Sequence, residues 1–115
     1  MSLSPDVPQV EPADAAQLVA DGAFLLDVRE DDEWEAGHAA AATHVRLSEI
    51  PSRVDEVPGD RTVIAICRAG GRSQQAAEFL RAQGIDAVNM AGGMWAWAAA
   101  DLDVVTGSGE AGAVI

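Results

Sequence analysis

The chain has 115 residues, the length of one ordinary domain, and a formal net charge of -12 from 19 Asp and Glu residues against seven basic residues. Such an acidic chain has no general attraction for phosphates, which argues against a DNA- or RNA-binding protein. Its single Cys cannot form an internal disulfide, and one Cys with two His cannot build a zinc site from these residue types alone. We therefore expect neither a metal nor a cofactor.

No stretch approaches the roughly 20 apolar residues of a membrane span, so no membrane contact is expected. Residues 1–11 lack the basic and apolar regions of a signal peptide, which makes the cytoplasm the expected location. Residues 1–8 are predicted to be a flexible leader and residues 9–105 a single domain. Residues 106–115 are rich in Gly, Ser and Ala and are predicted to be a flexible tail.

The pattern of apolar residues predicts strands that alternate with helices along the chain. The predicted strands lie near Val10 and over residues 23–28, 43–47, 61–66 and 85–90. The predicted helices run over residues 12–20, 30–37, 48–54 and 73–83, and from residue 92 onward. We interpret Ser48 and Ser73 as N-cap residues. This order is typical of an α/β protein with a mostly parallel, about five-stranded sheet that helices cover on both faces.

The single Cys, Cys67, follows the clearest predicted strand and precedes the clearest predicted helix. Ligands of open α/β sheets bind at this end of the strands. Gly70 and Gly71 let the backbone curl so that successive N–H groups converge, and the helix adds the positive end of its dipole. Such a loop stabilises an anion, so we expect a lowered pKa for the Cys67 thiol and a reactive thiolate. Arg68 and Arg72 strengthen the local positive field in an otherwise anionic protein.

A buried structural Cys is the commonest fate of a free thiol. That interpretation would leave the two Arg and two Gly residues of the loop without an explanation. We therefore favour a nucleophilic role for Cys67.

Five motifs occur in the order and spacing of rhodanese-like domains. They are Leu25-Leu26-Asp27-Val28-Arg29-Glu30, Glu33-Trp34, Gly37-His38, the loop from Cys67 to Ser73, and Gly92-Gly93-Met94. The chain resembles a single-domain rhodanese of the thiosulfate sulfurtransferase family over about residues 9–102. One departure is the run of four Ala at residues 39–42, where the family usually has an apolar residue followed by Pro, Gly and Ala. This segment is usually structural, so we expect activity to survive the change.

The resemblance implies a three-layer α/β/α rhodanese-like fold in which Cys67 carries a sulfane sulfur as a persulfide. The implied substrate-binding residues are those that follow the nucleophile, namely Arg68, Ala69, Gly70, Gly71, Arg72 and Ser73. Asp27 and Arg29 are predicted supporting residues, the first by hydrogen bonding into the loop and the second by pairing with a carboxylate. The implied activity transfers sulfur from thiosulfate, or a similar donor, to cyanide or a thiol, and a sulfur-relay protein is a candidate partner.

Three alternatives remain open. A non-catalytic rhodanese-like module that binds or regulates a partner generally lacks the Cys. Phosphatases related to this fold have five residues between Cys and Arg, whereas four separate Cys67 from Arg72, and this shorter loop fits a sulfur atom better than a phosphate. Arsenate reduction usually needs additional thiols, and the chain has one Cys.

The remaining candidates have simpler interpretations. The six carboxylates in residues 27–35 are interpreted as a solvated helix face, with a docking surface for a basic partner as the alternative. His38 and His44 are predicted to be structural rather than metal ligands or bases. Trp95 and Trp97 are two residues apart and cannot share one helix face, so we expect one in the core and the other at the pocket rim or a partner surface.

Overall fold

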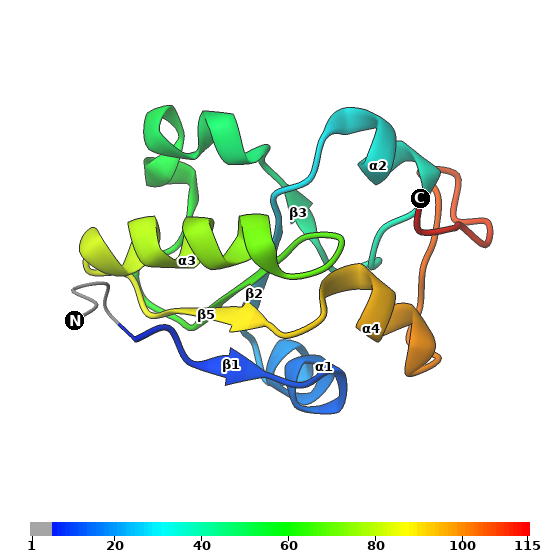
Figure 1. Ribbon diagram of the computed structural model, residues 1–115, viewed down its shortest axis with the longest axis horizontal. Coiled ribbons are helices and arrows are strands. Elements are labelled where there is room, and N and C mark those ends of the chain that lie inside the picture. Colours follow the sequence, from blue (N-terminus) through cyan, green and yellow to red (C-terminus); the bar gives the residue numbers. More distant parts are fainter. Residues whose placement is uncertain (1–5) are drawn as a thin grey trace.

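Five parallel strands form a sheet at the centre of the molecule, and helices cover both of its faces (Figure 1). The structure is a computed structural model that describes residues 6–115. In spatial order the sheet runs β1-β5-β4-β2-β3. The strands are β1 (Gln9–Val10), β2 (Phe24–Asp27), β3 (Thr43–His44), β4 (Val63–Ile66) and β5 (Ala87–Met90). The predicted five-stranded α/β fold is therefore confirmed.

Four α-helices and two short 3₁₀ helices accompany the strands within the described residues. They are α1 (Pro12–Ala20), α2 (Asp31–Ala36), α3 (Gly71–Ala82) and α4 (Gly93–Ala99), with the 3₁₀ helices at Leu47–Ser52 and Val54–Glu56. The segment predicted as a helix capped by Ser48 forms 3₁₀ turns instead. Pro51 lies inside it and cannot donate the backbone hydrogen bond that an α-helix needs at this position. No helix in residues 6–115 is long and apolar enough to span a membrane.

The side chains of β4 alternate between two separate hydrophobic cores. Val63 and Ala65 belong to the core that α3 and the 3₁₀ helices close, whereas Ile64 and Ile66 belong to the core that α1 and α4 close. All four are fully buried. Because β4 is covered on both faces, its sequence is a continuous apolar run rather than an alternation. The two cores give the molecule its three layers.

The expected leader is only partly described, because residues 1–5 lie outside the described residues. Val7 is buried in the core beside α3. The carbonyl of Pro8 accepts a hydrogen bond of 2.9 Å from the N–H of Asn89. Residues 7 and 8, in the segment predicted to be a leader, thus lie against the sheet.

The segment after α4, which includes the predicted tail at residues 106–115, folds back on the domain. An antiparallel bridge joins Val105 to Ala111, which closes a turn between them. The N–H of Ala113 then donates a hydrogen bond of 2.9 Å to the carbonyl of Ala36 at the end of α2. The Gly and Ser residues therefore shape a turn, and the last residues lie beside α2 (Figure 1).

Candidate functional site

Cys67 lies at the carboxyl end of β4, the middle strand of the sheet, and only 1% of its surface is exposed. It packs in the core beside α3, which begins four residues later. In parallel sheets this end of the strands is where loops and helix N-termini converge on ligands. The position predicted for Cys67 from the sequence is the one observed.

The Cys67 sulfur receives hydrogen bonds from the loop that follows it. The N–H of Gly70 lies 3.1 Å from Sγ, and the Ser73 hydroxyl lies 3.3 Å from it. Burial raises the pKa of the Cys67 thiol, but hydrogen bonds from the Ser73 hydroxyl and from the N–H groups of Ser73, Gly70 and Ala69 lower it. The hydrogen bonds prevail, so the pKa lies below its ordinary value and favours the thiolate.

Ser73 does not cap α3, which corrects the prediction from the sequence. The N-cap is Gly70, with a left-handed φ of 110° that suits glycine, and the helix starts at Gly71. Ser73 therefore lies inside the first turn, fully buried, where its hydroxyl is directed at Cys67 rather than at the helix end. The same hydroxyl lies 2.6 Å from Oδ1 of Asn89.

Asn89 on β5 connects the loop to the edge of the sheet. Its Nδ2 donates hydrogen bonds to the Gly70 carbonyl over 3.2 Å and to Oε1 of Gln9 over 2.8 Å. With Nδ2 committed to these two acceptors, Oδ1 faces Ser73 as an acceptor. The Ser73 hydroxyl has a single proton, so Asn89 and the Cys67 sulfur compete for it. The sequence interpretation missed Asn89, and a polar residue in a buried strand was the available signal.

The first residues of α4 donate backbone hydrogen bonds to the loop that follows Cys67. The N–H of Met94 donates to the Cys67 carbonyl over 2.7 Å, and that of Trp95 donates to the Arg68 carbonyl over 3.1 Å. Gly93 has a φ of +60°, and a Cβ at this position would overlap the Cys67 carbonyl oxygen. The loop can therefore lie against α4 only because residue 93 is glycine.

Arg72 forms a two-pronged ion pair with Glu33 of α2. Nη1 lies 2.6 Å from Oε1, and Nη2 lies 2.8 Å from Oε2. Hydrogen bonding from Arg72 is the main reason that the pKa of Glu33 falls to about 2. Glu33 is a site residue that the sequence interpretation missed, because it was grouped with the solvated acidic face. Its signal was the pattern Glu30-x-x-Glu33, a capping box that is present at the start of α2.

Arg68 is exposed and makes no ion pair within residues 6–115. Its guanidinium lies over the ring of Trp95, with Cζ 5.2 Å from the ring centroid. Trp97, in contrast, is buried in the core under α4. One of the two Trp thus lies in the core, as expected, and the other, Trp95, is exposed.

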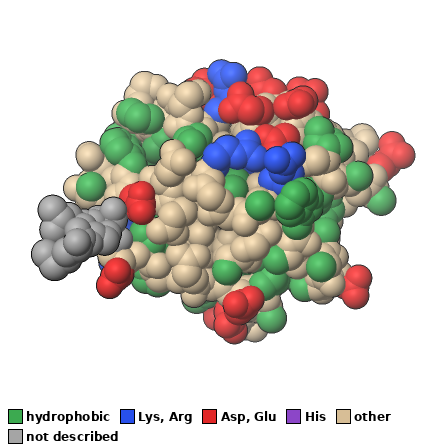
Figure 2. Space-filling model, in the orientation of Figure 1, with side chains coloured by type: hydrophobic (Ala, Val, Ile, Leu, Met, Phe, Trp, Pro, Cys, Tyr) green, Lys and Arg blue, Asp and Glu red, His purple; other side chains and the backbone are tan. Residues whose placement is uncertain are grey.

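An open pocket of about 390 Å³ lies at the mouth of the loop. Its lining residues are Glu30, Asp32, Glu33, Arg68, Arg72 and Ile115. Figure 2 shows this face, where positively charged side chains lie beside hydrophobic ones and acidic side chains border them. The pocket thus joins the two Arg of the loop, as predicted, and adds Ile115 from the C-terminal segment.

Asp27 and Arg29 pair with each other rather than with the loop. Both side chains are fully buried, and Nη2 of Arg29 lies 2.8 Å from Oδ2 of Asp27. The same nitrogen donates to the Gly37 carbonyl over 2.8 Å. The predicted hydrogen bond from Asp27 into the Cys67 loop is absent among the contacts of the described residues, whereas the predicted carboxylate partner of Arg29 is Asp27 itself. The pair ties the end of β2 to the end of α2.

His38 and His44 each stack on the ring of Trp34. The centroid distances to the Trp34 ring are 3.6 Å for His38 and 4.8 Å for His44, with nearly parallel planes. Nε2 of His44 also lies 2.6 Å from the Arg29 carbonyl oxygen. Their predicted structural role agrees with these contacts. No group of three or more His, Cys, Asp or Glu in residues 6–115 is arranged to hold a metal ion.

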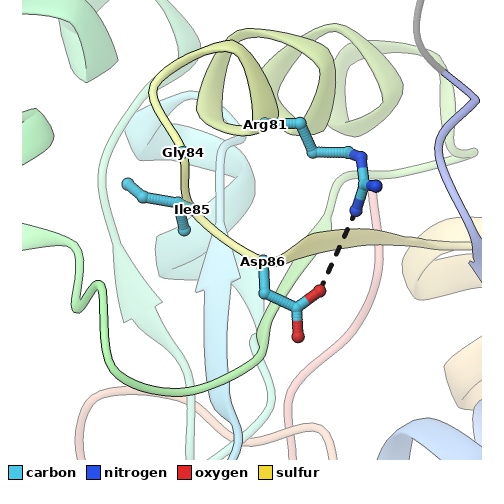
Figure 3. A pocket seen from close by; sticks show the side chains of 4 residues that line it. All are labelled: Arg81, Gly84, Ile85 and Asp86. Carbon is cyan, nitrogen blue, oxygen red and sulfur yellow. Dashed lines mark ion pairs between the residues drawn. The ribbon is translucent and has the colours of Figure 1, made fainter.

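A second open hollow of about 380 Å³ lies at the opposite end of α3, near Arg81, Gly84, Ile85 and Asp86 (Figure 3). Its one ion pair joins Nη1 of Arg81 to Oδ1 of Asp86 over 3.8 Å. None of the side chains that line it belongs to the Cys67 loop. Of these two pockets, the loop that follows Cys67 lines the one at the start of α3.

Comparison with known proteins places the same motifs in one family. Residues 11–100 match the family model of the rhodanese-like domain. A sulfurtransferase of Allochromatium vinosum is 36% identical over 106 residues, which are 90% of this chain and 99% of the relative. A rhodanese-related protein from Thermoplasma volcanium superposes with a TM-score of 0.80 at 30% identity, over 85% of this chain and 97% of that one. A rhodanese-like domain protein from Staphylococcus aureus gives 0.74 at 29% identity, over 79% and 91% of the two chains.

Proposed function

The chain belongs to the rhodanese-like domain family, and we propose that it is a sulfurtransferase in which Cys67 carries the transferred sulfur as a persulfide. The observation that supports this most directly is the environment of the Cys67 sulfur. It accepts hydrogen bonds from Gly70 and Ser73, and the pKa of the thiol is lowered despite burial. A thiolate held in this way is the nucleophile that covalent sulfur transfer needs.

In the first step, the Cys67 thiolate attacks the outer sulfur of thiosulfate. A new S–S bond forms to Cys67, and the S–S bond of the donor breaks. The electron pair of that bond leaves with sulfite, and Cys67 keeps the outer sulfur as a persulfide anion. The N–H groups of Ala69, Gly70 and Ser73, which already favour the thiolate, stabilise the charge on the transferred sulfur as an oxyanion hole does for oxygen.

Arg68 binds the sulfonate group of the donor in this proposal. It is exposed at the pocket and free of carboxylate partners within residues 6–115. The sequence predicts that Arg72 binds the donor together with Arg68, but both terminal nitrogens of Arg72 are already bonded to the Glu33 carboxylate. It therefore supplies positive charge to the pocket wall while Arg68 makes the direct contact.

In the second step, a nucleophile removes the outer sulfur and regenerates the Cys67 thiolate. Cyanide would leave as thiocyanate, and a thiolate would leave as a persulfide. Cys67 is the chain's single Cys, so no internal thiol can accept the sulfur. The acceptor is therefore external, a small thiol or a sulfur-relay protein, and the cytoplasm, whose reducing conditions keep Cys67 free, is the proposed site of action.

Sulfur loading tests the proposal. The protein is incubated with thiosulfate, freed of the donor, and measured by intact-mass spectrometry with and without later addition of cyanide. We expect a mass gain of one sulfur atom that cyanide removes and that Cys67→Ser abolishes. A folded wild-type protein that gains no sulfur from thiosulfate would overturn the proposed donor, and one that gains none from any sulfane-sulfur donor would overturn the persulfide mechanism.

A matched pair of variants tests the role of Arg68. Arg68→Ala and Arg61→Ala each remove one positive charge, but Arg61 precedes β4 and pairs with Asp60 away from the pocket. Loss of a charged hydrogen bond to the donor should raise KM for thiosulfate by about ten- to a hundredfold in Arg68→Ala. We expect no such rise in Arg61→Ala.

The phosphatase alternative is tested with an aryl phosphate. Four residues separate Cys67 from Arg72, and the guanidinium of Arg72 is engaged by Glu33 rather than free to hold a phosphate. We expect no turnover of the aryl phosphate under conditions in which sulfur transfer proceeds.

A further inference from the structure

Asn89 gives the Ser73 hydroxyl a second acceptor beside the Cys67 sulfur. The Ser73 oxygen lies 2.6 Å from Oδ1 of Asn89 and 3.3 Å from Sγ of Cys67. A hydroxyl group has one proton, so it donates to one of these acceptors at a time. Ser73 is fully buried and Asn89 is 4% exposed, so bulk water does not reach the hydroxyl. The choice between the two acceptors is therefore made inside the protein.

The orientation of the Asn89 amide is fixed by backbone carbonyls. The Gly70 carbonyl can only accept a hydrogen bond, so the Asn89 atom that lies 3.2 Å from it is Nδ2. The same Nδ2 donates over 2.8 Å to Oε1 of Gln9, whose own Nε2 donates over 3.1 Å to the Val7 carbonyl. With both amides fixed in this way, Oδ1 of Asn89 faces Ser73 as an acceptor.

The charge on the Cys67 sulfur decides which of the two acceptors is the stronger. The sulfur of a neutral thiol is a weak acceptor, so the Ser73 proton stays on the carbonyl oxygen of Asn89. A thiolate is a strong acceptor and draws the proton to itself. Oδ1 then loses its hydrogen bond in a buried position, which costs free energy. Asn89 therefore opposes the thiolate that Ser73 supports.

Charged groups lie near the Cys67 loop on several elements. The loop and the first turn of α3 carry Arg68 and Arg72, the start of α2 carries Glu30, Asp32 and Glu33, and the end of β2 carries the paired Asp27 and Arg29. β1, β5 and α4 carry no charged residue. Because the variants described below alter none of these charges, they isolate the effect of hydrogen bonding on the charge state of Cys67.

We infer that Asn89 is a positioning residue that holds the Ser73 proton while the Cys67 sulfur is uncharged and yields it when the thiolate forms. This inference rests on the proposed sulfur transfer through Cys67. In that reaction the thiolate forms an S–S bond to the outer sulfur of thiosulfate, the S–S bond of the donor breaks, and its electron pair leaves with sulfite. The negative charge now lies on the outer sulfur, so Sγ is uncharged and the Ser73 proton returns to Asn89. Asn89 thus destabilises the thiolate relative to the persulfide and favours sulfur loading.

Titration of Cys67 tests the inference without any sulfur transfer. The chain has one Cys and no Tyr, so the ultraviolet absorbance of a thiolate reports Cys67. Asn89→Leu keeps a side chain of similar size and removes Oδ1. We expect the ratio of thiolate to thiol below the midpoint to rise by about three- to tenfold, because the competing acceptor is lost. A purely structural role predicts the opposite sign, since a loosened loop would withdraw the Gly70 N–H from the sulfur.

A double-mutant cycle shows whether Asn89 acts through the hydroxyl. In a Ser73→Ala background, Asn89→Leu should no longer raise the ratio, because no hydroxyl remains to be released. Gln9→Ala, at an exposed residue of β1, removes one of the two acceptors of Nδ2 and should raise the ratio by about twofold. This variant decides the test if Asn89→Leu does not fold. Gln17→Ala is the control, since Gln17 is an exposed glutamine on α1 that pairs with Asp21, and it should leave the titration unchanged.

The loading equilibrium is the second readout. In mixtures of thiosulfate and sulfite, above the midpoints of both titrations, the ratio of persulfide to free Cys67 should be about three- to tenfold lower in Asn89→Leu than in wild type. An equal ratio would show that Asn89 does not favour the persulfide. An unchanged or lower thiolate ratio in the deciding variant, or a rise that persists without the Ser73 hydroxyl, would overturn the inference. A wild-type protein that takes up no sulfur would overturn the proposed function, whereas the titration would still show whether Asn89 controls the hydroxyl.

Discussion

The carboxylate of Glu33 and the guanidinium of Arg72 face each other through two hydrogen bonds, of 2.6 and 2.8 Å, across 39 residues of sequence. Glu33 belongs to α2 and Arg72 to the first turn of α3. Only 10% of the Glu33 side chain is exposed. The pair therefore holds the acidic helix against the loop that carries Cys67, and it fixes one wall of the pocket.

The first prediction concerns the stability that this ion pair provides. Glu33→Gln should lower the free energy of unfolding by about 1–3 kcal/mol at pH 7, because a charged hydrogen-bonded pair is lost. The pKa of Glu33 falls from 4.5 to about 2 on folding, chiefly through its hydrogen bonds to Arg72. A lowered folded-state pKa stabilises the protein above the unfolded value, and that stability is lost as the pH falls from about 4.5 towards 2.

Urea unfolding between pH 7 and pH 3 measures this effect. The difference between wild type and Glu33→Gln should be largest at pH 7 and should shrink as the pH falls. Glu35→Gln is the matched control, since Glu35 is exposed on the same helix and makes no ion pair with the described residues. A difference that stays constant with pH would show that Glu33 acts through packing rather than charge.

The second prediction concerns the hydroxyl of Ser73, which lies 3.3 Å from the Cys67 sulfur. Ser73→Ala removes a donor that lowers the pKa of the thiol, so the pKa should rise. The rate of alkylation of Cys67 by iodoacetamide, measured against pH, should therefore move to higher pH in this variant. Ser48→Ala, on the 3₁₀ helix that follows β3, should leave the profile in place. An unchanged profile for Ser73→Ala would mean that backbone N–H groups alone hold the thiolate.

The central features of the site could be predicted from sequence because they follow from local rules. A β-branched apolar run predicts a buried strand, and Gly residues after it predict a sharp turn at the end of the strand. These rules place Cys67 where the structure has it. They fail for Ser73, because a Ser near a helix start is usually a cap, whereas the left-handed Gly70 caps the helix three residues earlier.

The features that escaped prediction depend on contacts between distant segments. Glu33 meets Arg72 only when α2 and α3 converge, and the capping-box pattern that distinguishes this carboxylate from its acidic neighbours marks the start of a helix, not a partner on α3. The C-terminal segment was predicted to be flexible from its composition, although Gly and Ser also mark turns. The turn closes because Ala113 finds a partner on α2, which composition cannot reveal. By contrast, the alternation of side chains at the end of β2 already places Asp27 and Arg29 on one face, so their pairing could have been predicted.

The third prediction concerns this buried pair. Asp27→Asn or Arg29→Met alone leaves one charged or polar group buried without its partner, which should cost about 3–5 kcal/mol in the free energy of unfolding. The double variant Asp27→Asn/Arg29→Met removes both charges and should be less destabilised than the sum of the single variants. Urea unfolding of the four proteins gives the coupling energy. Additive effects would show that the two side chains act independently.

The last prediction concerns Gly93, against which the Cys67 loop lies. Gly93→Ala combines a strained backbone, at a φ of +60°, with a Cβ that would overlap the carbonyl groups of Cys67 and Arg68. Gly84→Ala is a matched control, because its φ is +86° but nothing lies within 4 Å of the added Cβ. The control should cost about 1 kcal/mol of stability through backbone strain and leave sulfur transfer unchanged. Gly93→Ala should cost more stability and should slow sulfur loading of Cys67 by about a hundredfold, since a displacement of about 1 Å in a catalytic loop has that effect. Thermal unfolding and the rate of persulfide formation measure the two effects, and equal loading rates in both variants would show that the contact with α4 does not position the Cys67 loop.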